Sequence, residues 1–130
     1  EYTDFIINAC YLNEEDPASH WVKVRESQQK VVDHLNSCLH FRYKSPVIDI
    51  TFTTEGRTWI NSDGKTNMPS GEVYTSPVEN SVNGFITFTL PSLYQGHMIE
   101  NVKLEVKDGY IEHWSSDNKT EILDDLAKQL

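Results

Sequence analysis

The chain has 130 residues, of which 38% are hydrophobic and 24% are charged, so it can bury the core of about one domain. Its formal net charge of −9 repels phosphate backbones and argues against nucleic acid as a partner. No apolar run approaches the roughly 18 residues of a membrane-spanning helix, so we expect no membrane partner either.

The chain begins at Glu1 and enters an apolar stretch directly, without a signal peptide. We therefore expect a piece of a longer protein or a processed form. Two cysteines, Cys10 and Cys38, are too few for the disulfide framework of a small secreted domain. Each is expected to be a small buried thiol in a reducing compartment, which predicts a cytoplasmic location.

The N-terminal third contains the helical signals. Residues 1–15 include a short apolar segment that fits a helix or a strand. Asp16 can cap a helix and Pro17 suits its first position, so we expect a helix from there to about Ser37. Its predicted apolar face consists of Trp21, Val24, Val31, Val32 and Leu35. Its predicted solvent side contains Arg25, Gln29 and Asp33.

After Pro46 the hydrophobic period changes to two, which is typical of a half-buried strand. The alternating apolar residues are Ile48, Ile50 and Phe52. A tight turn at Glu55-Gly56 is expected to lead into residues 57–61, and 62–64 form a second turn signal.

The C-terminal half predicts further strands and a last helix. Residues 85–90 are rich in β-formers, and 102–107 alternate. Asp108-Gly109 is the strongest hairpin signal of the chain and leads into a strand over 110–114. A helix is expected over about 119–130, with Ile122, Leu123, Leu126 and Leu130 on one stripe. The order of helix, mostly antiparallel sheet with a long ordered loop, and C-terminal helix predicts an α+β fold in a single domain over residues 1–130.

The long polar stretch over residues 56–84 is the most informative feature. A loop of this length inside a compact domain is either functional or disordered, and its Met, Trp, Tyr and Val residues argue against disorder. It contains Glu72, which directly follows Gly71. A carboxylate next to a flexible turn can be presented to a metal ion or to a substrate amine, although Glu72 also fits a solvated loop acid.

Other catalytic motifs are absent from the sequence. The histidines show no HExxH spacing, and no GxSxG elbow, P-loop or GxGxxG run occurs. We expect each histidine to be structural or exposed: His20, His34, His40, His97 and His113. Neither cysteine has an activating context. The three tryptophans, Trp21, Trp59 and Trp114, are expected to be core aromatics.

The stretch GRTWINSDGKTNMPSGEVYTSPVENSVNG closely resembles the signature of the M29 metallo-aminopeptidases, the thermophilic aminopeptidase group. The matching pieces are Gly56-Arg57 with Trp59, the block over residues 67–75 with Pro77, and residues 82–84. The NMPSGEV block is the specific part, and weaker similarity extends over nearly the whole chain.

The resemblance implies a fold, an activity and a site. The family removes N-terminal residues from peptides with two divalent ions in its C-terminal domain, and Glu72 matches one of the metal ligands. The other ligands of the family lie beyond Leu130, so no histidine of this chain is assigned to the metals and no catalytic residue is assigned here. The implied cofactors are two divalent ions (Zn, Co, Mn or Mg), the implied substrates are peptides with a free N-terminus, and the implied assembly is a homodimer.

Because one carboxylate does not complete a two-metal centre, we predict that the 130-residue chain alone does not hydrolyse peptides. Asn67, Ser70 and Tyr74 are expected to support the loop around Glu72. Two alternatives stay open from the sequence. One is a non-catalytic binding or oligomerisation module in which Glu72 is incidental, and the other is a metal-independent hydrolase, which no nucleophile motif supports.

Overall fold

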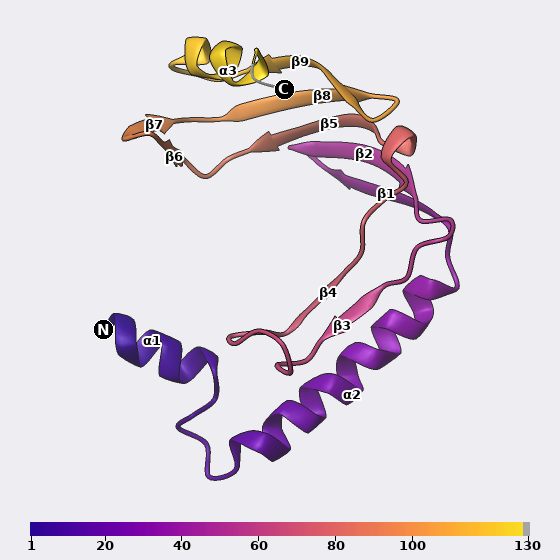
Figure 1. Cartoon of the computed structure of the whole chain (residues 1–130), viewed down its shortest axis with the longest axis vertical. Coiled ribbons are helices and arrows are strands. Elements are labelled where there is room, and N and C mark those ends of the chain that lie inside the picture. The colour runs from indigo at the N-terminus through magenta and orange to yellow at the C-terminus, as the bar shows by residue number, and fades with distance from the viewer. Residues whose placement is uncertain (129–130) are drawn as a thin grey trace. The chain divides into compact units, whose positions relative to one another are not determined.

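A computed structural model describes residues 1–128, which form two compact units. The first unit combines residues 1–39 with 56–76, and the second combines 40–55 with the chain from 77 onward. The first unit contains the helices α1 (Tyr2–Ala9) and α2 (Pro17–Asn36) and the strands β3 (Ile60–Ser62) and β4 (Glu72–Tyr74) (Figure 1). The expectation of a single domain stays a prediction.

Helix α2 begins where the sequence predicts. The Asp16 carboxylate accepts hydrogen bonds from the Ser19 backbone N–H at 3.1 Å and from Ser19 Oγ at 2.5 Å. These bonds satisfy a free donor of the first turn and lower the pKa of Asp16. Pro17 occupies the first turn, and Ser37 is the C-cap. The apolar segment before it is the helix α1 rather than a strand.

The core of the first unit lies along one face of α2. Trp21 and Val32 are buried there, together with Cys10 and Trp59. Trp21 Nε1 donates a hydrogen bond of 3.0 Å to the Cys10 carbonyl oxygen, so the ring is satisfied within the core. Both cysteines are free thiols; Cys10 is buried as expected, whereas Cys38 is half-buried.

Two predictions about α2 are wrong. Val31 is 49% exposed, because Val32 lies about three full turns after Trp21 and Val31 therefore lies about 100° away from the buried stripe. Arg25 is half-buried rather than on the solvent side, since its guanidinium pairs with Asp63. Gln29 and Asp33 are exposed as predicted.

The second unit is built on a five-stranded antiparallel sheet in the order β1-β2-β5-β8-β9 (Figure 1). The strands are β1 (His40–Ser45), β2 (Ile48–Thr53), β5 (Asn83–Phe88), β8 (Val102–Lys107) and β9 (Tyr110–Ser115). A separate hairpin joins β6 (Ser92–Tyr94) to β7 (His97–Ile99). The helix α3 (Thr120–Ala127) ends the described chain, so Leu130 of the predicted stripe lies outside the described residues.

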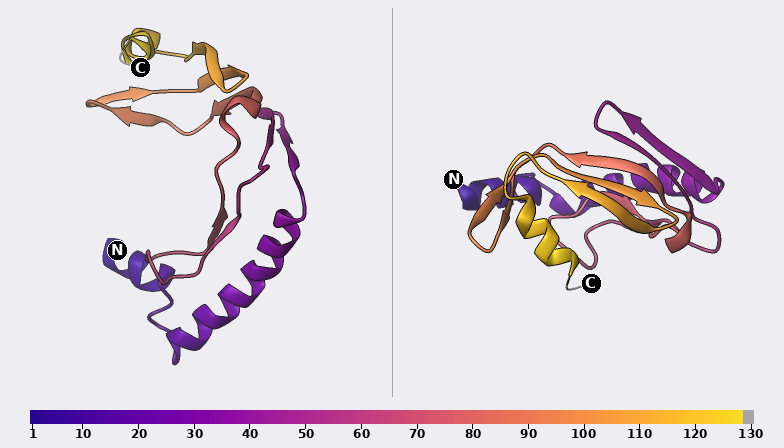
Figure 2. Two further views of the ribbon diagram at one scale, coloured as in Figure 1. Left: turned by 45° about the vertical axis from the view of Figure 1, so that its right-hand side comes forward. Right: turned by 90° about the horizontal axis from the view of Figure 1, so that it is seen from above.

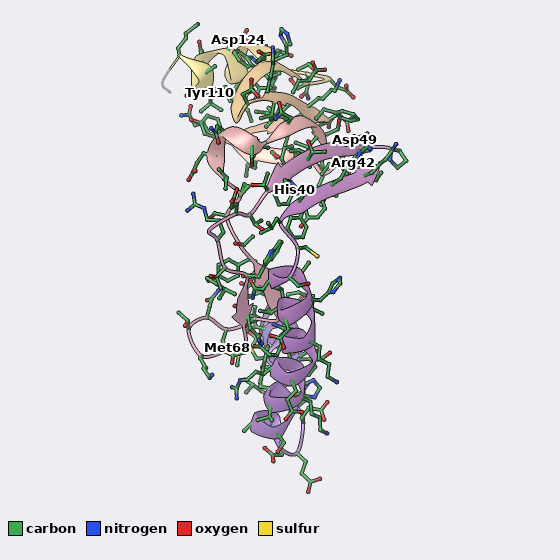
Figure 3. The ribbon with its side chains drawn as sticks, turned by 90° about the vertical axis from the view of Figure 1, so that its right-hand side faces the viewer. His40, Arg42, Asp49, Met68, Tyr110 and Asp124 are labelled. Carbon is green, nitrogen blue, oxygen red and sulfur yellow. The ribbon has the colours of Figure 1, made fainter. Side chains whose placement is uncertain are left out.

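Strand β1 was not predicted from the sequence, although Phe41 and Tyr43 alternate with polar residues in it, and most of its side chains are exposed. Pairing with β2 stabilises β1. The rings of Phe41 and Phe52 stack with centroids 5.4 Å apart. Arg42 donates two hydrogen bonds of 2.7 Å to the Asp49 carboxylate and thereby lowers the pKa of Asp49 (Figure 3).

The hairpin at Asp108-Gly109 is confirmed. Both residues have positive φ, 49° and 83°, which is the backbone of a type I′ turn. It joins β8 to β9, with a register shift between Glu105 and Val106. Trp114 Nε1 donates a 2.8 Å hydrogen bond to Asp124 and so links α3 to β9.

Much of the stretch over residues 56–84, predicted as a long loop, is regular secondary structure. It contains β3, β4, the 3-10 helix η1 (Glu79–Ser81) and the first two residues of β5. No helix within residues 1–128 combines the length and apolar character that crossing a bilayer requires.

Candidate metal-binding hairpin

Glu72 is the first residue of β4 in a small antiparallel hairpin of the first unit. We call β3, β4 and the connecting residues 63–71 the Glu72 hairpin. Asn61 pairs with Val73, and Ser62 pairs with Glu72. The Gly71 backbone N–H donates a hydrogen bond of 3.1 Å to the Ser62 carbonyl oxygen. Gly71 has a φ of 106°, which favours glycine, and it closes the loop directly before Glu72.

The alternation of β4 directs the Glu72 side chain to solvent. Glu72 and Tyr74 are exposed, whereas Val73 between them is half-buried. Successive side chains of a strand point to opposite sides, so burial of Val73 on one side places the Glu72 carboxylate on the other. The carboxylate is therefore accessible to a ligand.

Gln28 of α2 connects the helix to both strands of the Glu72 hairpin. Its Nε2 lies 2.9 Å from Asn61 Oδ1, 3.1 Å from the Ser62 carbonyl oxygen and 2.9 Å from the Glu72 carbonyl oxygen. Figure 2 shows the two strands running alongside α2. The backbone of Glu72 is thus attached to the longest helix of the described chain.

A second group of contacts binds the same hairpin to α2. Asn61 Nδ2 donates to the Arg25 carbonyl oxygen at 3.0 Å and to Gln29 Oε1 at 3.2 Å. The Arg25 guanidinium donates to Asp63, which also lies 3.2 Å from Lys65 Nζ. Asp63 is only 9% exposed, and the hydrogen bond from Arg25 is the main cause that lowers its pKa.

Replacing Asp63 by Asn tests this ion pair through pH. A carboxyl whose pKa is lower in the folded than in the unfolded protein adds stability above its unfolded pKa, and this stability is lost as pH falls through the folded pKa. We expect Asp63→Asn to melt at a lower temperature than the native chain at pH 7. The difference should shrink below about pH 4, where an ordinary aspartate becomes protonated. Thermal melts followed by circular dichroism check this. A difference in melting temperature that stays the same at all pH values would contradict it.

The residues expected to support Glu72 have different environments. Ser70 Oγ lies 2.7 Å from Ser62 Oγ, so Ser70 does link the loop to β3. Asn67 is exposed, as is the neighbouring Met68 (Figure 3), and Tyr74 is 46% exposed. The two side chains that bind the hairpin most directly to α2, Gln28 and Arg25, were not predicted.

The histidines do not gather around Glu72. His20 stacks on Tyr11 with centroids 3.6 Å apart, and His97 Nδ1 lies 3.3 Å from Lys119 Nζ. His34, His40 and His113 are exposed. Within residues 1–128, no three His, Cys, Asp or Glu side chains are close enough together to hold a metal ion. Among these residues Glu72 is therefore not part of a complete set of metal ligands.

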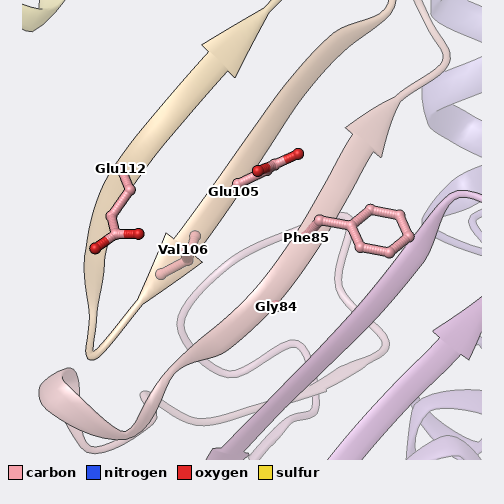
Figure 4. A pocket seen from close by; sticks show the side chains of 5 residues that line it. All are labelled: Gly84, Phe85, Glu105, Val106 and Glu112. Carbon is pink, nitrogen blue, oxygen red and sulfur yellow. The ribbon is translucent and has the colours of Figure 1, made fainter.

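A shallow hollow on the sheet of the second unit contains two further carboxylates, those of Glu105 and Glu112 (Figure 4). Lys103 Nζ lies 2.6 Å from Glu105, and this hydrogen bond lowers the pKa of Glu105. Lys107 Nζ lies 3.8 Å from Glu112. Because each carboxylate already has a lysine partner, this hollow is a weaker candidate for a cation than the Glu72 hairpin.

The chain belongs to a family of metalloproteases. The family model described as "Thermophilic metalloprotease (M29)" matches residues 1–129, which confirms the resemblance. Aminopeptidase AmpS of Bacillus subtilis (strain 168) is 31% identical over 136 residues, and the match covers 96% of this chain and 32% of AmpS. Aminopeptidase PepS of Streptococcus thermophilus is 30% identical over 135 residues, covering 94% of this chain and 32% of PepS.

The fold is also found in a solved structure. Wild-type AmpT from Thermus thermophilus matches with a TM-score of 0.69 and 21% sequence identity, covering 86% of this chain and 31% of AmpT. This similarity confirms the α+β fold. The chain spans about a third of the length of the curated relatives that it matches.

Proposed function

We propose that this chain is part of a metal-dependent aminopeptidase that removes N-terminal residues from peptides, and that Glu72 is a ligand of its two-metal centre. The observation that supports this most directly is the exposed Glu72 carboxylate on a hairpin bound to α2. Its surrounding sequence block matches the metalloprotease family, and the similar curated proteins are named aminopeptidases.

A carboxylate is a chemically suitable ligand for the divalent ions in question. Its oxygens bind Mg²⁺ and Mn²⁺ and are accepted by Zn²⁺ and Co²⁺, so all four metals remain in the proposal. When bound, a pair of such ions lowers the pKa of a water molecule and polarises the scissile carbonyl. Glu72 contributes negative charge and one ligand position, and the α2 contacts keep its backbone in place.

One carboxylate does not complete such a centre, so the proposal assigns the remaining ligands to residues outside this sequence. Within residues 1–128 no cluster of three possible ligands occurs, which is consistent with that assignment. The substrate of the intact protein is proposed to be a peptide with a free N-terminus. The proposal also includes a homodimer and, supported by the free thiols of Cys10 and Cys38, a cytoplasmic location.

The missing ligands give the proposal a direct test. We expect the purified 130-residue chain to show no turnover of leucine-p-nitroanilide, while the intact protein hydrolyses it and loses this activity with a chelator. Circular dichroism of the isolated chain should show that it is folded. Chelator-sensitive turnover by the isolated chain would overturn the assignment of ligands elsewhere. An intact protein that neither binds divalent metal nor cleaves the substrate would favour a non-catalytic binding module.

A further inference from the structure

Gln28 forms the most concentrated set of contacts around Glu72. Three acceptors lie within 3.1 Å of its single Nε2 atom: a side-chain oxygen of β3, the last carbonyl of β3 and the first carbonyl of β4. An amide nitrogen has two hydrogens, so the three acceptors share them. These acceptors surround the point where the strands of the Glu72 hairpin diverge into the loop.

Pairing between the two strands of the hairpin holds this end only weakly. Each of its strands has three residues, and an isolated two-stranded ribbon of this size is marginally stable in water. Helix α2, with 20 residues, is a more rigid support. The Gln28 amide also lies beside the turn, since a Cβ at Gly71 would be in ordinary van der Waals contact with Gln28 Oε1, at 3.7 Å.

From this geometry we propose that Gln28 is the positioning residue of the site, holding the β4 backbone so that the Glu72 carboxylate reaches a divalent ion. This inference rests on the proposed function of Glu72. A metal ligand must be held within about 0.5 Å of its productive position, and loss of a supporting contact typically costs 10–100-fold in metal affinity. Gln28 touches the main chain of Glu72 and not its carboxylate, so it acts through Glu72.

The test uses the intact protein with Gln28→Met, which keeps the length of the side chain and removes the donor. Lys30→Met is the matched control, because it introduces the same residue at an exposed position of the same helix. The affinity for Zn²⁺ alone is measured by competition with a chelating dye, the Co²⁺-loaded protein by its visible absorption, and hydrolysis by kcat and KM separately. Hydrogen exchange of residues 71–74 in the metal-free protein reports on the backbone itself.

We expect Gln28→Met to bind Zn²⁺ about 10–100-fold more weakly, to change the Co²⁺ spectrum and to exchange faster over residues 71–74, with kcat lowered more than KM is raised. Lys30→Met should match the native protein in each measurement. Gln28→Asn, which keeps an amide on a shorter side chain, should show a smaller loss of affinity and serves if the Met variant does not fold.

Two results would overturn the inference, and they are distinguishable. If Gln28→Met and Gln28→Asn bind Zn²⁺ as the native protein does while Glu72→Gln loses it, Glu72 is a ligand and Gln28 does not position it. If Glu72→Gln itself retains the metal, the proposed function of Glu72 fails, and the role of Gln28 fails with it.

Discussion

Glu72→Gln in the intact protein is expected to lower metal occupancy and to slow peptide hydrolysis by several orders of magnitude. The substitution keeps the shape of the side chain and removes its negative charge. A neutral amide oxygen is a poorer ligand for a divalent cation than a carboxylate, and the chemistry proposed for the site depends on a bound ion. The measurements are metal content by mass spectrometry after dialysis and kcat/KM with leucine-p-nitroanilide at saturating metal.

Glu26→Gln is the matched control for this experiment. Glu26 is an exposed glutamate in α2 of the same unit, so the same change of charge is made away from the hairpin. The control should keep its metal and its rate. Unchanged metal content and activity in Glu72→Gln would refute the assignment of Glu72 and would favour a loop carboxylate that is only solvated.

The second large effect is expected on stability. Gly84 lies in β5, in the middle of the five-stranded sheet, with a φ of 129°. A Cβ at this position would lie 2.0 Å from the Asp49 carbonyl oxygen and 2.9 Å from Ile50 Cα, both in the backbone of β2. We therefore expect Gly84→Ala to destabilise the second unit by about 3–5 kcal/mol, from the strained backbone and the steric overlap together.

Gly96→Ala separates these two causes. Gly96 also has a positive φ, 79°, but a Cβ there would meet nothing within 4 Å. Gly96→Ala should lower the free energy of unfolding by about 1 kcal/mol, which is the strain of an unfavourable backbone conformation alone. Urea denaturation of both variants, followed by circular dichroism, gives the comparison. If both variants lose the same small amount of unfolding free energy, the β2 and β5 backbones can separate at little cost.

The elements that the sequence predicted well have local causes. The start of α2 depends on Asp16 and Pro17, which act within one turn of the helix. The β8–β9 hairpin depends on Asp108-Gly109, two adjacent residues that adopt the positive φ of the turn. Such signals lie within a few residues of the structure that they determine, so a single sequence is sufficient to recognise them.

The short strands β3 and β4 were missed because they depend on a partner far along the chain. Helix α2 holds both of them. Strand β1 is a different case, because it pairs with β2, the next strand along the chain. A signal for the polar contacts was nevertheless present in the helix. Arg25 and Gln28 lie between Trp21 and Val32 at spacings of four, three and four residues, which places all of them on one face. Two polar residues in the middle of a buried stripe indicate polar partners opposite them.

The candidate site was predicted only in part. Glu72 was singled out by its place after Gly71 and by the family resemblance, and its role as a ligand stays a prediction. The sequence did not indicate that Gln28 and Asn61 bind the hairpin to α2, because this arrangement depends on contacts 32 to 44 residues apart in sequence.

The interleaved composition of the two units has a consequence for biosynthesis. Residues 40–55 belong to the second unit, yet they are translated before the segment 56–76 that completes the first. When α2 leaves the ribosome, Trp59 and the β3–β4 pair that pack with it have not yet emerged from the exit tunnel. The nascent helix must therefore keep Trp21 and Val32 exposed until the hairpin emerges. A ribosome that pauses between these segments would prolong this exposure and give chaperones a longer time to bind.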